Sequence, residues 1–107
     1  MDDRIEYFIK KVQNCFSSFL KFNSFVADSE FFADQNKDLF SEEECVKYEQ
    51  LWLDLEIINA LVIEKWEIDK DSGIKLWEKT CKKDAEKTML EIIAFFKNLQ
   101  YIENKNE

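Results

Sequence analysis

The near absence of turn-forming residues is the feature that most limits how this chain can fold. Its 107 residues include no proline and one glycine. These two residues supply much of the backbone geometry of tight turns, so the chain should have few connections between its elements. We therefore expect an all-α protein, an antiparallel bundle of three long helices with or without a short additional helix. A chain of this length forms a single domain, residues 1–107, in which the last few residues fray.

Apolar residues spaced three and four apart define the first helix. Asp2 or Asp3 can cap its start, and the apolar positions continue as Ile5, Phe8, Ile9, Val12, Phe16, Phe19, Leu20 and Val26. This spacing predicts one helix of about six turns that ends between Phe25 and Asp28. A short helical turn at 28–33 and a loop at 34–39 should follow. Because Phe31 and Phe32 are adjacent, only one of them can point into the core.

Two further helical segments are expected. Ser41 followed by Glu44 has the spacing of a capping box, and it predicts a second helix from Glu42 to about Glu67. The residues Asp69–Gly73 predict the turn that ends this helix. Apolar residues then recur at helical spacing up to about Gln100. Polar residues cluster at Thr80–Lys83, so the sequence leaves open whether residues 72–101 form one helix or two.

The run Leu51–Trp66, within the second helix, is the most apolar part of the chain. On a helix, one stripe of this region comprises Tyr48, Leu51, Trp52, Leu55, Ile58, Val62 and Trp66. This stripe is wide enough to form the core contact. A second stripe, toward the opposite side, comprises Val46, Leu53, Ile57, Ala60 and Leu61. It is covered either by another segment of this chain or by a partner, and the sequence leaves both options open.

The acidic residues are concentrated around the same helix. The chain has a net charge of −8, and residues 41–73 contain ten acidic residues against three lysines. Such a negative field repels nucleic acid and anionic membranes and attracts basic proteins. Alternatively, it only keeps a phenylalanine-rich protein soluble.

The composition excludes several kinds of chemistry. Histidine is absent, which removes the usual proton-transfer residue, Ser-His and Cys-His pairs and most zinc sites. Cys15, Cys45 and Cys81 occupy apolar helix positions, where we expect small buried side chains rather than metal ligands. A single glycine leaves no phosphate-binding loop. We therefore expect neither an enzyme nor a bound cofactor.

The cytoplasm is the expected location. The N-terminal residues 1–8 are acidic and lack the layout of a secretory signal. The apolar run contains Asp54 and Glu56 and is too short to span a bilayer. Three cysteines cannot pair completely, which suits a reducing compartment.

Two segments resemble small all-helical bacterial toxin-immunity proteins. They are LWLDLEIINALVIEKWE at residues 51–67 and LWEKTCKKDAEKTMLEI at residues 76–92. The resemblance extends from Tyr48 to Ile92 and rests on Trp52, Trp66, Trp77 and an alanine-containing last helix. It implies a rigid, acidic, non-enzymatic protein that occludes the active site of a basic nuclease toxin.

We expect a protein partner to contact the second stripe and the acidic residues beside it: Glu49, Leu53, Asp54, Glu56, Ile57 and Glu64. Carboxylates would speed association with a basic toxin domain, and apolar side chains would hold it. Two alternatives use the same features. One is a self-associating adaptor whose stripe closes a two-fold dimer. The other is an acidic mimic of nucleic acid, from a phage or plasmid. The sequence does not decide between a monomer and a homodimer.

Overall fold

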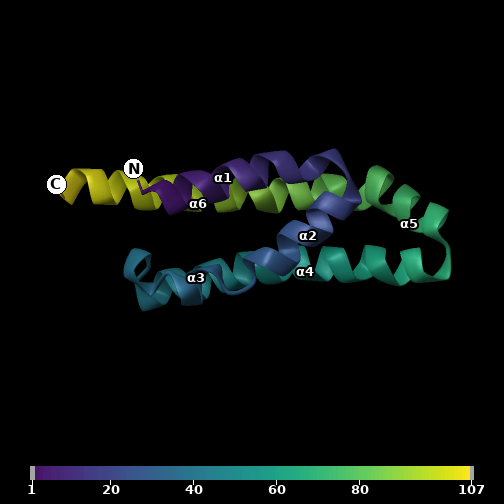
Figure 1. Cartoon of the computed structure of the whole chain (residues 1–107), viewed down its shortest axis with the longest axis horizontal. Coiled ribbons are helices and arrows are strands. Elements are labelled where there is room, and N and C mark those ends of the chain that lie inside the picture. Colours follow the sequence, from purple (N-terminus) through teal and green to yellow (C-terminus); the bar gives the residue numbers. More distant parts are fainter. Residues whose placement is uncertain (1, 107) are drawn as a thin grey trace.

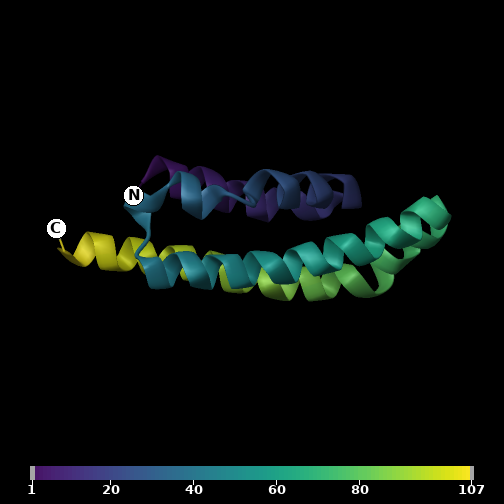
Figure 2. The same ribbon diagram turned by 90° about the horizontal axis from the view of Figure 1, so that it is seen from below.

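A computed structural model describes the backbone of residues 2–106 and the side chains of residues 2–99. The helices form two layers, with α1, α2 and α3 in one and α4 and α6 in the other (Figures 1 and 2). Helix α1 contacts α6, and α2 and α3 contact α4. No strand occurs within the described backbone, and the expected all-α class is confirmed.

The first layer contains a break that the sequence analysis missed. Helix α1 (Asp3–Asn14) ends in a 3-10 turn at Cys15–Ser17, and α2 (Phe19–Ser29) starts after it. Ser18 between them is extended, and its hydroxyl accepts a hydrogen bond from the Lys21 amide at 3.2 Å. The prediction of one continuous first helix is therefore wrong. Apolar spacing hid the break because both helices bury phenylalanines on either side of it.

The connection to the second layer is more helical than expected. Helix α3 (Phe32–Gln35) and a 3-10 turn at Lys37–Leu39 replace most of the predicted loop. Phe31 is 56% exposed, whereas the Phe32 ring lies 4.4 Å from that of Phe8. The prediction that only one of the two phenylalanines points inward is confirmed.

Helix α4 (Glu42–Ile68) starts where the capping box predicted. The Ser41 hydroxyl accepts a hydrogen bond from the Glu44 amide at 3.2 Å, and the Glu44 carboxylate accepts one from the Ser41 amide at 2.8 Å. The helix ends one residue beyond the expected position. Its start was predictable because the capping residues act locally.

The chain reverses at the site of the turn predicted at Asp69–Gly73 (Figure 1), but only Asp69 interrupts the helices and residues 70–73 are helical. Asp69 is extended and caps α5 (Lys70–Leu76), which contains Gly73 in helical conformation. A Cβ on Gly73 would lie 2.7 Å from the Trp66 Cα atom. The glycine therefore allows α5 to pack closely against α4.

A wider π-helical turn at Trp77–Cys81 joins α5 to α6 (Lys82–Asn106). This turn overlaps the break expected at Thr80–Lys83. The sequence left open whether residues 72–101 form one helix or two, and the structure has two helices, α5 and α6, joined by an irregular helical turn. The predicted fraying concerns the tail at residues 103–107, whose side chains lie outside the described part of the chain.

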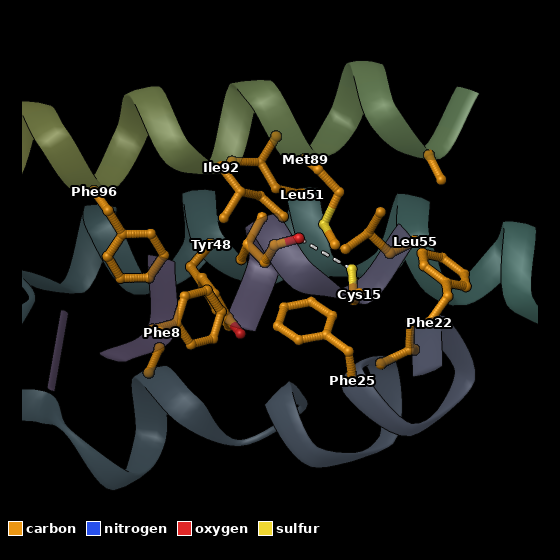
Figure 3. Close-up of a cluster of buried hydrophobic side chains, with 14 of the residues drawn as sticks. Phe8, Cys15, Phe22, Phe25, Tyr48, Leu51, Leu55, Met89, Ile92 and Phe96 are labelled. Atoms are coloured by element: carbon orange, nitrogen blue, oxygen red, sulfur yellow. Dashed lines mark hydrogen bonds between the residues drawn. The ribbon is translucent and has the colours of Figure 1, made fainter. Parts of the chain in front are cut away.

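The core lies between the two layers and is rich in aromatic side chains (Figure 3). Tyr48, Leu51, Leu55 and Val62 on α4 are buried, as the first stripe predicted. Trp52 and Trp66 are only half-buried, and Trp77 is the buried tryptophan among the described residues. Most other large core side chains come from the other helices: Ile5, Phe8, Phe19, Phe22, Phe25, Met89, Ile92, Phe96 and Leu99. Phe40, also buried, lies in the extended residue pair just before α4.

Candidate protein-binding site

The side of α4 opposite the core carries a row of exposed apolar residues. We call this the outer row: Val46, Leu53, Ile57, Ala60, Leu61 and Ile68. Its five large side chains are each at least half exposed, with Leu53 at 51% and Ile57 at 52%. Isolated exposed apolar residues are common on proteins, whereas several along one helix face form a candidate contact surface. The structure thus leaves the second stripe of α4 uncovered by the described part of this chain.

Hydrogen bonds hold the opposite side of α4 against α2. Three α4 side chains donate to α2: Tyr48 to the Ser29 carbonyl, Trp52 to the Val26 carbonyl at 2.9 Å, and Asn59 to the Asn23 side chain at 2.9 Å. Because these donors recur along one side of the helix, they fix its rotation about its own axis. The outer row therefore faces outward without help from a partner, which lowers the entropy cost of binding.

The buried amide of Asn59 is only partly satisfied. Its Nδ2 atom donates to Asn23, but its Oδ1 atom is buried and has no hydrogen-bond partner. An unsatisfied buried carbonyl lowers stability. The pair nevertheless restricts how α2 can pair with α4, because a shift along the helix axis would separate the two amides.

The predicted contact residues all lie on α4, and the structure places most of them at the surface. Leu53 and Ile57 belong to the outer row, and Glu49, Asp54 and Glu64 are exposed beside it. Glu56 is half-buried. The acidic residues thus border an apolar row, the arrangement expected at the rim of a protein interface. Their role in binding stays a prediction.

A groove between α4 and α6 adds residues that the sequence analysis missed. It has a volume of about 350 Å³ and is lined by Asp54, Ile57, Ile58, Asp84, Lys87, Thr88 and Glu91. We call it the α4–α6 groove. The α6 side chains that line the groove share one face of that helix. From the sequence alone, this face is expected to be a solvent-exposed surface of mixed charge. The proximity of these side chains to Ile57 depends on how α6 pairs with α4, which spacing within one helix does not reveal.

The three cysteine thiols lie in environments that favour the protonated form. All three thiols are unpaired, with Cys15 and Cys81 buried and Cys45 half-buried. Burial raises the pKa of Cys15 to about 12 and also raises the pKa of Cys45 and of Cys81. A thiol with a raised pKa is protonated near neutral pH, and the thiolate is the form that attacks or binds metal. The expectation of buried apolar-type cysteines is confirmed for Cys15 and Cys81.

The described residues were also compared with the requirements of a metal site and of a membrane-spanning helix. No group of three or more acidic, cysteine or histidine side chains among them is arranged to hold a metal ion. None of their helices is long and apolar enough to cross a membrane.

Comparison with known proteins gave no relative for this chain. No protein-family model matches it, and neither do any curated proteins or solved structures.

Proposed function

We propose that this protein is an immunity protein, a cytoplasmic inhibitor that binds a basic toxin domain and occludes its active site. A nuclease is the toxin class that best fits an acidic inhibitor, because nucleases bind a polyanion with a basic surface. The observation that carries the proposal is the outer row, an exposed apolar surface on the most acidic helix of the chain.

The outer row and its acidic border would have different tasks in such a complex. Leu53 and Ile57 would be buried by the partner, and apolar anchors at the centre of an interface supply most of the binding energy. Glu49 and Asp54 would remain near the rim, where charges mainly raise the association rate. The half-buried Glu56 would lie between these two zones.

The test begins with capture of the tagged full-length protein from its source cells. Mass spectrometry should identify one basic partner in equal amount, and added inhibitor should abolish the activity of the purified partner. Ile57→Asp should weaken the complex at least tenfold, a loss of about 1.4 kcal/mol. Leu20→Asp is the matched control, because Leu20 is also exposed but lies on α2. Recovery of the protein alone, as a dimer closed by the outer row, would contradict the proposal.

A further inference from the structure

We propose that the partner element seated on this protein is an amphipathic helix with basic residues along its edges, lying along the outer row and the α4–α6 groove. This inference rests on the proposed function and goes further, because it specifies the secondary structure and charge of the bound segment. It also brings α6 into the site.

The shape of the outer row favours a helix as the occupant. Val46, Leu53, Ile57, Leu61 and Ile68 follow one another along α4 at spacings of seven, four, four and seven residues, which keep them on one face of a helix. They span 22 residue steps, or about 33 Å of helix axis. A second helix packed nearly parallel to α4 can place its own apolar residues between these positions over the whole length. An extended strand has a side-chain period of two and would match the row at few points.

The α4–α6 groove would receive one edge of that helix. Ile57 and Ile58 supply apolar surface, while Asp54 on α4 and Asp84 and Glu91 on α6 supply carboxylates. Lysine or arginine can lay its methylene groups on the isoleucines and direct its charge to the carboxylates. Lys87 is the one basic residue that lines this groove, so the lining as a whole favours a cation.

Charge argues against a second copy of α4 as the occupant. Residues 42–68 contain eight acidic residues and two lysines, so two such helices repel each other. The exposed side of α6 does contain lysines, but Leu90 is its one exposed large apolar residue within the described range. The exposed side of α6 therefore has too few apolar side chains to pack between the residues of the outer row. A basic amphipathic helix from another protein satisfies both the apolar and the charge requirement.

A synthetic peptide tests the inference directly. The probe is a fluorescein-labelled helical peptide of leucine, alanine and lysine, with leucines at heptad positions a and d and lysines along both edges. The control peptide has the same composition, rearranged to a period of two. Fluorescence anisotropy with the full-length protein should show binding of the first peptide and at least tenfold weaker binding of the second. Equal binding of both peptides would overturn the inference, because charge alone would then explain the attraction.

Protein variants locate the bound peptide. Ile57→Asp should weaken binding at least tenfold, and the matched Leu20→Asp less than twofold. On α6, Glu91→Lys should weaken binding at least threefold, whereas Glu86→Lys should have a smaller effect. Glu86 is exposed on the same helix but does not line the α4–α6 groove. If the members of either pair behaved alike, the assigned docking surface would be wrong.

Two further results separate this inference from the proposed function. If a captured toxin loses affinity for Ile57→Asp while the helical peptide does not bind, the helix assignment fails and the inhibitor function stands. If sedimentation shows a dimer that Ile57→Asp dissociates, a second copy covers the outer row and the inference is overturned.

Discussion

Leu53 and Leu55 are separated by one residue on α4 and lie on opposite sides of it. Leu55 is fully buried, whereas Leu53 is 51% exposed. Leu55→Ala should therefore lower the free energy of unfolding by about 2–5 kcal/mol through lost burial and cavity formation. Leu53→Ala should lower it by less than about 1 kcal/mol, because much of its surface is already in water.

Urea denaturation of both variants gives the comparison. The two substitutions remove the same atoms from the same helix, so differences in helix propensity cancel. Similar losses at the two positions would mean that the outer row is part of the core and is not available to a partner.

Close packing between two elements explains the only glycine of the chain. A Cβ at position 73 would lie 2.7 Å from the Trp66 Cα atom, so α5 would have to move away from α4. We expect Gly73→Ala to destabilise the protein by about 1–3 kcal/mol, although alanine favours a helix by about 1 kcal/mol relative to glycine. Lys75→Ala, at an exposed position of α5, should change stability by less than about 0.5 kcal/mol. Calorimetric unfolding that shows Gly73→Ala to be stabilising would disprove this packing constraint.

An ion pair links the first helix to the connection between the layers. The Arg4 guanidinium donates to both carboxylate oxygens of Asp38, at 2.7 Å and 3.1 Å. This hydrogen bonding by Arg4 lowers the pKa of Asp38 below its ordinary value of 3.8. Because the folded-state pKa is the lower one, the pair stabilises the fold above the unfolded-state pKa. That stabilisation is lost as the pH falls through the folded-state pKa.

Asp38→Asn should therefore lower the melting temperature at pH 7. The difference in melting temperature between this variant and the native protein should become smaller below about pH 4, where Asp38 loses its charge in the native protein. Asp34→Asn is the control, because Asp34 is an exposed carboxylate outside the Arg4 network. A melting-temperature difference that stayed constant between pH 7 and pH 3 would show that the ion pair is not the cause.

The elements differ in how well the sequence predicts them, and the reason is the range of the interaction that sets each boundary. The side chains of Ser41 and Glu44 each accept a hydrogen bond from the other's backbone amide, so the signal for the start of α4 lies within four residues and was predictable. The break at Ser18 lacks a glutamate or glutamine three residues later and has Lys21 instead, so no capping box marks it. The sequence predicts a turn residue at Gly73, because the constraint that acts there, the close approach to Trp66, comes from another helix.

The candidate site shows the same limit at the scale of the whole molecule. The second stripe of α4 could be predicted from the sequence, because Leu53 and Ile57 oppose Leu51 and Leu55 on one helix. The sequence left open whether another segment of this chain covers that stripe, and the structure shows it exposed. Asp84, Thr88 and Glu91 could not be assigned to the site, because their place beside Ile57 depends on the pairing of α6 with α4.

The distribution of charge leads to a prediction about association with a basic partner. If placement matters, reversing Glu49 and Glu56 on α4 should slow association more than reversing two acids on the other layer. Glu49→Lys/Glu56→Lys and Glu6→Lys/Asp34→Lys change the net charge by the same amount, but only the first pair lies on α4, the helix that carries the outer row. Local charges at an interface steer the final approach, whereas net charge acts weakly beyond about 8 Å at physiological salt.

Stopped-flow measurements with the captured partner distinguish the two effects. We expect Glu49→Lys/Glu56→Lys to lower the association rate at least tenfold at low salt. The ratio of the native rate to the variant rate should fall as the salt concentration rises, because salt screens the charges. The pair on the other layer should lower the association rate less and leave the dissociation rate unchanged. Equal slowing by the two pairs would mean that net charge alone attracts the partner. An unchanged rate in both would remove the acidic border of α4 from the binding mechanism.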